Sequence, residues 1–137
     1  MKVLVLTSEA IGAEQLRAAL GPDADPADTE VMVVAPALQN SALKFWFSDA
    51  DDAIAKADDV RRETLERLSD EGVSASADTG ESDPMVAIED ALRTFRADRI
   101  VLFTHPEGDE RYREDLDPDE VQSRLGIPVD RAALPAA

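Results

Sequence analysis

The sequence predicts an α/β fold: an open, five-stranded parallel sheet with helices on both of its faces. Short apolar runs of strand length alternate along the chain with amphipathic segments of helix length, giving five strands and four helices. The clearest run, Ile100–Phe103, is apolar at every position, as expected for a strand buried on both faces. Strands that alternate with helices favour parallel pairing through right-handed crossovers. With 137 residues, the chain has room for one such domain.

The N-terminal part is expected to form a strand, a short helix and a polar loop. Lys2–Leu6 is an apolar run of strand length. Ile11–Leu20 follows as a helix, with Ser8 as its candidate N-cap and Gly21-Pro22 as its end. The segment 21–29 is rich in Asp, Ala and Pro and is interpreted as a solvated loop.

A second buried strand and a long helix are expected next. Glu30–Ala35 contains three valines and ends before Pro36. The long helix begins at Ser48, a candidate cap that precedes a first turn rich in Asp. Gly72 is the expected residue just past its C-terminus. The segment 37–47, which lies between them, is assigned to neither class.

A weaker strand at Val73–Ala77 precedes the best-defined helix. Asp83 is the candidate N-cap of that helix and Pro84 fits its first position. Its apolar stripe consists of Met85, Ile88, Leu92 and Phe95. Arg93 and Arg96 are placed in the last turn, where positive charge complements the helix dipole.

The C-terminal part is expected to supply one more helix and the last strand. Asp117-Pro118 repeats the Asp-Pro start, and Gly126 closes the helix. The final strand is predicted at Ile127–Leu134. Pro128 stands near its start, a position that an edge strand tolerates.

The composition excludes several classes of function. Acidic residues outnumber basic ones, 30 to 14, and the net charge is −16. A surface of this sign repels nucleic acid and anionic lipid, so neither is expected as a partner. The chain has no cysteine and one histidine. This argues against a disulfide framework, thiolate chemistry and a zinc site.

The sequence also bears on localisation. No segment approaches the roughly 18 consecutive apolar residues of a membrane-spanning helix. The opening MKVLVLTSEA has a short apolar run followed by an acidic residue, which is typical of a first strand and not of a signal peptide. A cytoplasmic location is therefore expected.

Several motifs, taken in order, resemble the universal stress protein family. They are EGV at 71–73, GESDP at 80–84, IEDAL at 88–92, ADRIVLFTHP at 97–106 and IPV at 127–129. In the family, a Gly-Asp-Pro helix start precedes an Ala-Asp-Leu-Ile-Val strand and a Gly-Thr/Ser-His-Gly loop. The resemblance implies one universal stress protein-like domain over residues 1–137, with a Rossmann-like sheet ordered 3-2-1-4-5. It also implies homodimers, commonly formed through the last strand.

The chain departs from this family at the positions that grip ATP. Family members that bind ATP carry Gly-x2-Gly-x9-Gly-Ser/Thr after the fourth strand. Aligned on Thr104-His105, those small positions are occupied here by Phe103, Pro106, Leu116 and Asp117. The family's Asp at the end of strand one corresponds to the region Thr7-Ser8-Glu9. No cofactor is therefore expected, and ATP or AMP held by the usual glycine grip is disfavoured.

Ligands of open α/β sheets bind beyond the carboxyl ends of the strands, where the strand order reverses. The candidate ligand-binding residues at that edge are Thr7, Ser8, Ala35, Thr104, His105 and Gly108. The alternative for the hydroxyl-bearing residues is that they cap helices and satisfy backbone groups. For His105, a structural role is preferred over catalysis because no partner that would position it is evident.

The candidate interface residues are Phe45, Trp46, Phe47 and Val129. Three consecutive aromatic residues cannot all point inward, so an interface or a lid is preferred over a base-stacking platform. Val129 lies in the last strand, through which the family commonly dimerises.

Three hypotheses of function follow. The first is a non-enzymatic, universal stress protein-like module that acts through dimerisation and through binding of a partner or small ligand. The second is an adenine-nucleotide-binding or slowly hydrolysing protein with a divergent pocket at the carboxyl ends of strands one and four. The third is a small enzyme of the wider adenine-nucleotide α-hydrolase-like superfold, which fold alone does not support. The first is preferred because the glycine grip is missing and no catalytic residue is identified.

Overall fold

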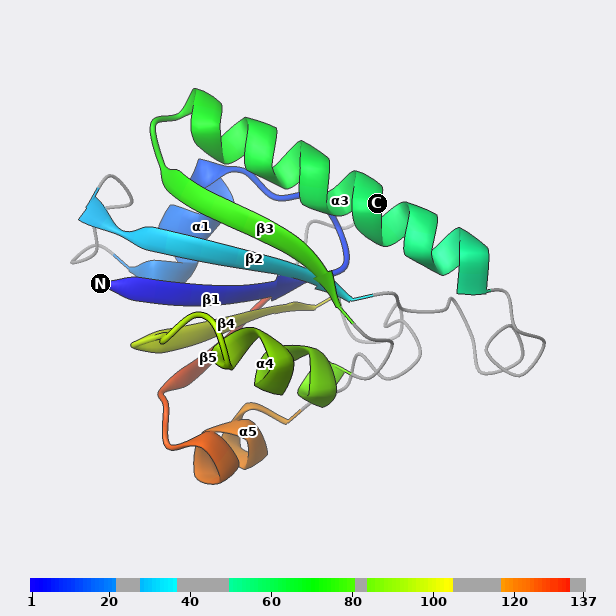
Figure 1. Ribbon diagram of the computed structural model, residues 1–137. Helices are drawn as coiled ribbons and strands as arrows, with labels where there is room; N and C mark the ends of the chain where they lie inside the picture. The colour runs from blue at the N-terminus through cyan, green and yellow to red at the C-terminus, as the bar shows by residue number, and fades with distance from the viewer. Residues whose placement is uncertain (22–27, 37–49, 81–83, 105–116, 134–137) are drawn as a thin grey trace.

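The computed structural model describes residues 1–21, 28–36, 50–80, 84–104 and 117–133, which form one five-stranded parallel sheet and four helices (Figure 1). The strand order is β3-β2-β1-β4-β5. The predicted fold class and the order implied by the resemblance are therefore confirmed. The elements are β1 (Lys2–Thr7), α1 (Ala13–Leu20), β2 (Glu30–Pro36), α3 (Ala50–Asp70), β3 (Ser74–Gly80), α4 (Pro84–Leu92), β4 (Arg99–Thr104), α5 (Pro118–Leu125) and β5 (Val129–Ala133).

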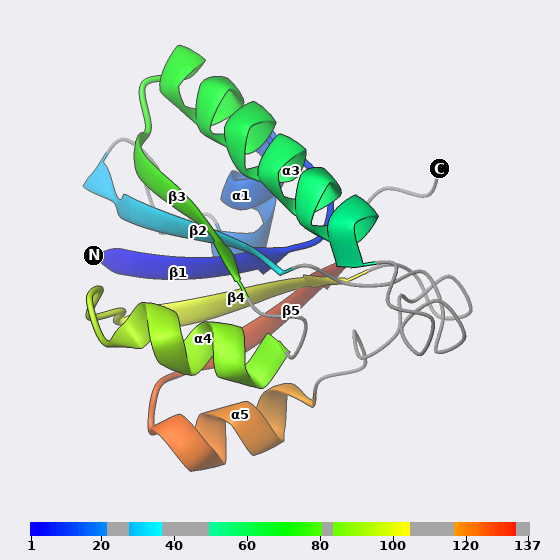
Figure 2. The same cartoon turned by 45° about the vertical axis from the view of Figure 1, so that its right-hand side comes forward.

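The helices form one layer on each face of the sheet. Helices α1 and α3 cover one face, and α4 and α5 cover the other, as the two views in Figures 1 and 2 show. The chain passes from β1 to β2 and β3 on one side, then returns to add β4 and β5 on the other side of β1. Crossovers of a single hand place the helices on opposite faces when the direction reverses. The reversal makes the β1/β4 boundary the switch point of the sheet.

Strands β1 and β4, which meet at the switch point, are buried on both faces. In β1, Val3 and Val5 point into the core under α1 and α3, whereas Leu4 and Leu6 point into the core on the opposite side. In β4 the residues alternate in the same way between the two cores. Apolar side chains are needed at every position when both faces are covered. This explains why both strands are continuous apolar runs in the sequence.

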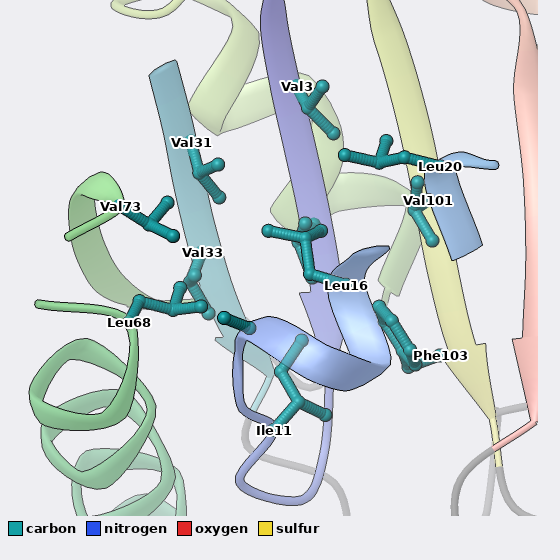
Figure 3. Packing of buried hydrophobic residues seen from close by; sticks show 12 residues of the cluster. Val3, Ile11, Leu16, Leu20, Val31, Val33, Leu68, Val73, Val101 and Phe103 are labelled. Carbon is teal, nitrogen blue, oxygen red and sulfur yellow. The ribbon is translucent and has the colours of Figure 1, made fainter. Parts of the chain in front are cut away.

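The core under α1 and α3 joins both helices to the three strands β1, β2 and β4. Leu16 and Leu20 of α1 and Leu68 of α3 are buried against valines of these strands, and Figure 3 shows them converging on the sheet. The core under α4 and α5 contains Met85, Ile88, Phe95 and Val121. Both layers therefore hold a contiguous apolar core of their own.

The edge strand β3 is more polar than the others. Ala75 and Ala77 are partly buried toward α3, whereas Ser74, Ser76 and Asp78 are exposed. Its pairing with β2 runs from Ser74 to Gly80, three residues further than the sequence predicts.

Three of the predicted helix C-termini are confirmed, and the first is that of α1, which ends at Leu20 with Gly21 as its C-cap. Gly72 has a φ of 78°, and the Val73 amide donates to the Leu68 carbonyl while the Gly72 amide donates to the Ser69 carbonyl. This pair of bonds is the Schellman motif. At α5, the Asp117 carboxylate accepts from the Asp119 amide and Gly126 is left-handed with a φ of 69°. These caps depend on residues close together in the chain, so they can be predicted from the sequence.

Other boundaries differ from the predictions. Helix α1 begins at Ala13 with Gly12 as its N-cap, not near Ser8, because residues 8–12 cross to contact α3. Helix α4 ends at Leu92, so Arg93 and Arg96 follow it instead of forming its last turn. Phe95 nevertheless stays buried, because the turn after the helix carries it back into the core.

Strand β5 begins at Val129, so Ile127 and Pro128 precede it. The predicted caps Ser48 and Asp83, together with Leu134, lie outside the described residues. Within the described parts of the chain, no helix is long and apolar enough to cross a membrane.

Candidate functional site at the carboxyl edge of β1 and β4

The ends of β1 and β4 lie side by side at the switch point. Thr7 is in register with Phe103, which places Thr104 one residue beyond it on the neighbouring strand. The backbone positions of Thr7 and Thr104 thus converge as the sequence predicts. Thr7 and Ser8 are buried, with 1% and 7% of their surfaces exposed.

The Thr7 hydroxyl is used within its own turn. It donates to the Glu9 carbonyl at 2.6 Å and accepts from the Glu9 amide at 3.3 Å. A threonine hydroxyl has one proton to donate, and the carbonyl takes it. This geometry favours the structural role for Thr7 over a ligand-binding one, since a ligand would compete with the turn for the same proton.

The loop after β1 is attached to α3, a feature that sequence reasoning missed. The Ile11 amide donates to the Thr64 hydroxyl at 3.2 Å, and the Lys56 ammonium lies 2.8 Å from a Glu9 carboxylate oxygen. Thr64 is completely buried. The sequence does contain a signal for this contact. In the apolar stripe of α3, formed by Ala57, Val60 and Leu68 at helical spacing, Thr64 is the one polar residue. The partner of its hydroxyl, however, is set by the tertiary fold.

Ala35 lies at the carboxyl end of β2, as predicted, but its side chain faces α3. It is fully buried and packs with Ala57 and Val60. A methyl group in this position fills the space between strand and helix, so the observed role of its side chain is packing.

The N-terminus of α5 is occupied by the chain's own carboxylates. Asp117 accepts the Asp119 amide at 3.0 Å, and Asp119 and Glu120 stand in the first turn. All three residues are exposed. Helix N-termini are favourable sites for phosphate because their amides are unpaired and the helix dipole is positive there. At α5, one amide is already satisfied and the local charge is negative.

Val129, the interface candidate in β5, lies largely in the core. Only 9% of its surface is exposed, and it belongs to the apolar cluster that includes Val121 of α5. Its amide donates to the Gln122 side chain at 3.2 Å. The remaining candidates, His105, Gly108, Phe45, Trp46 and Phe47, lie outside the described residues.

Comparison with known proteins does not extend these observations: no family model matches the chain, and no curated protein matches it. Within the described segments, no group of three or more His, Cys, Asp or Glu side chains is arranged to hold a metal ion.

Proposed function

We propose that this protein is a universal stress protein-like, non-enzymatic module that acts through dimerisation and through binding of a partner or small ligand. Two observations support the assignment. The parallel sheet with order β3-β2-β1-β4-β5 is compatible with that family's fold. Two of the motifs that carry the resemblance fall at element boundaries of the kind it implies: GESDP runs from the end of β3 to the start of α4, and ADRIVLFT leads into and forms β4.

The capped N-terminus of α5 is the observation that favours a module that does not bind ATP through the family's glycine motif. In the resemblance, Asp117 takes the place of a small residue that would let phosphate approach. Its carboxylate accepts the Asp119 amide and stands beside two further acidic residues. A phosphate would have to displace this bond and approach three negative charges, which disfavours binding there.

Nucleotide binding is the alternative, and a thermal unfolding assay separates the two. A ligand at a hundredfold excess over its Kd raises the free energy of unfolding by about 2.7 kcal/mol. We expect no stabilisation by ATP with Mg²⁺ or by AMP. A clear stabilisation that is lost in Ser8→Ala or Thr104→Val, and retained in the control Ser123→Ala on the exposed face of α5, would establish the nucleotide-binding alternative instead.

Dimerisation is tested separately by light scattering. Strand β5 ends the sheet, so its outer edge has no neighbouring strand within the described chain. A charge at Val129 would disturb the core as well as any interface, because that side chain is buried. Arg131 is exposed on the same strand and is the better position. We expect a dimer that Arg131→Glu weakens and that Arg93→Glu, the same charge change on an exposed turn, leaves intact.

A third variant addresses the aromatic segment. We expect Trp46→Ala to weaken the dimer, because residues 45–47 are proposed to contribute to the interface. A monomeric mass for the unmodified protein at all concentrations would contradict the dimer proposal. The result would leave the nucleotide test unaffected.

A further inference from the structure

The loop that follows β1 contacts α3 through three consecutive residues. The Glu9 carboxylate pairs with Lys56, and the Ala10 carbonyl accepts from the Arg67 guanidinium at 3.4 Å. The Ile11 amide donates to the Thr64 hydroxyl. The partners on α3 lie between Lys56 and Arg67, a span of about three turns of helix. They lie along one side of α3, the side that also packs on the sheet through Val60 and Leu68.

Two of the three contacts, the Thr64–Ile11 hydrogen bond and the Lys56–Glu9 ion pair, differ in burial. The Thr64–Ile11 hydrogen bond is buried, and both residues are completely inaccessible to solvent. The Lys56–Glu9 ion pair is partly exposed, with 43% and 35% of the two side chains accessible. A buried amide without an acceptor is costly, whereas a partly exposed ion pair contributes little. The buried Thr64–Ile11 bond therefore sets the position of the loop, and the partly exposed Lys56–Glu9 pair limits its fluctuation.

The loop lies directly beyond Thr7, at the switch point where β1 and β4 meet. Gly12 ends it, and the Arg67 side chain passes within van der Waals distance of the place where a Gly12 side chain would begin. Figures 1 and 2 show the segment after β1 rising from the sheet toward α3 before it enters α1.

From this arrangement we propose that α3 is a clamp on the β1–α1 loop: the loop opens at the switch point only when its contacts with Thr64, Lys56 and Arg67 are released. The clamp is a conformational device of the fold and does not depend on the proposed function, because it requires neither a ligand nor a dimer. It couples the position of a helix on one face of the sheet to the shape of the sheet's carboxyl edge.

Amide hydrogen exchange measured by NMR on the full chain tests the clamp. Thr64→Val removes the acceptor of the Ile11 amide and leaves residues 9–12 unchanged, so their intrinsic exchange rates stay the same. We expect exchange at Ile11 to accelerate about tenfold, the factor that corresponds to 1.4 kcal/mol, relative to the amides of β1. Thr64→Ser keeps the hydroxyl and should retain slow exchange. Expressing the exchange rate of Ile11 relative to the rates of the β1 amides corrects for any change in global stability.

Lys56→Gln provides an independent test that keeps the core intact. We expect the Glu9 amide to exchange about two- to fivefold faster, in line with the modest free energy of an exposed ion pair. Arg62→Gln is the matched control, because Arg62 pairs with Asp59 on the same helix. Equal acceleration of loop and β1 amides in Thr64→Val would overturn the clamp, as would unchanged exchange at Glu9 in Lys56→Gln. If Thr64→Val does not fold, Lys56→Gln decides alone.

Discussion

The α1/α3 layer and the α4/α5 layer cover the same sheet, yet they are attached to it differently. In the first layer, polar side chains reach backbone groups of distant segments: Arg99 of β4 donates to the carbonyls of Ala19 and Leu20, and Thr64 accepts from Ile11. In the second layer, Ile88, Phe95 and Val121 pack on the sheet as an apolar cluster, and the backbone bond that Gln122 of α5 accepts comes from nearby Val129. The ion pair that joins α4 to α5, Glu89–Arg124, is exposed at 3.4 Å.

Apolar packing and directional hydrogen bonds contribute differently to how a helix layer is positioned on the sheet. Apolar packing supplies most of the free energy of folding, but it is non-directional and tolerates small shifts. A hydrogen bond to one particular backbone group is directional, and breaking it leaves a buried group unpaired. In the α1/α3 layer such bonds lie at both ends of the strands, near the start of β4 through Arg99 and beyond the end of β1 through Thr64.

The largest expected effect comes from the apolar layer. Ile88 is fully buried, so Ile88→Ala should lower the free energy of unfolding by about 2–5 kcal/mol, through lost burial and a residual cavity. Leu68→Ala should do the same in the opposite layer. Urea denaturation measures both, and Ile88→Val, at about 0.5–1.5 kcal/mol, is the graded control. A loss below about 1 kcal/mol for Ile88→Ala would contradict tight packing under α4.

The next largest effect tests the polar attachment. Arg99 donates to two carbonyls at the end of α1 and to Asp130 at 2.6 Å, and only 24% of its side chain is exposed. Arg99→Met keeps most of the aliphatic stem and should cost about 1.5–3 kcal/mol in urea denaturation. Arg93→Met is the control, since Arg93 is 80% exposed and its change should be close to zero. Equal effects for the two variants would show that the attachment contributes nothing.

Two glycines, one in each layer, should behave alike. Gly72 and Gly126 have φ values of 78° and 69°, and no atom lies within 4 Å of where a β-carbon would be placed on either. Replacement by Ala therefore costs backbone strain alone, about 1–2 kcal/mol at each position. Thermal unfolding of the two variants measures it. A markedly larger loss at one of them would mean that the C-terminus of that helix has a role beyond its cap.

The smallest effect is expected for the ion pair between α4 and α5. Arg124→Gln should lower the free energy of unfolding by less than about 1 kcal/mol, because both side chains are well exposed and solvent screens their attraction. The difference should shrink further when denaturation is repeated at high salt. An effect that is large and independent of salt would place this pair among the determinants of the α4/α5 layer.

Much of the fold could be predicted because its signals are local or periodic. The run Ile100–Phe103 indicates a strand buried on both faces, and Asp117-Pro118 with Gly126 delimits α5. The end of α4 could not be predicted in this way. The stripe of Met85, Ile88, Leu92 and Phe95 continues at helical spacing, yet the helix ends at Leu92 and a turn carries Phe95 into the core. Apolar periodicity identifies buried residues but does not tell a last helical turn from a tight turn after it.

Of the candidate site, the relative placement of two strand ends could be predicted. The convergence of Thr7 and Thr104 follows from parallel strands and a reversal of strand order, and the register of β1 with β4 confirms it. The partner of the Thr7 hydroxyl is a local turn. Ser8 was predicted as the N-cap of α1, but Gly12 takes that position, because the loop before the helix follows a course set by its contacts with α3, more than fifty residues later.

The sequence alone predicted the order of elements and the burial of the central strands. It also predicted the helix caps at Gly72, Asp117 and Gly126. Each rests on chemistry within a few residues: apolar periodicity, a carboxylate that accepts a nearby amide, or a glycine that allows positive φ. The attachment of the β1–α1 loop to α3 through Thr64 and Lys56 emerged only from the folded arrangement. These contacts join residues about fifty positions apart, and their geometry exists only after the sheet has brought α3 over the end of β1.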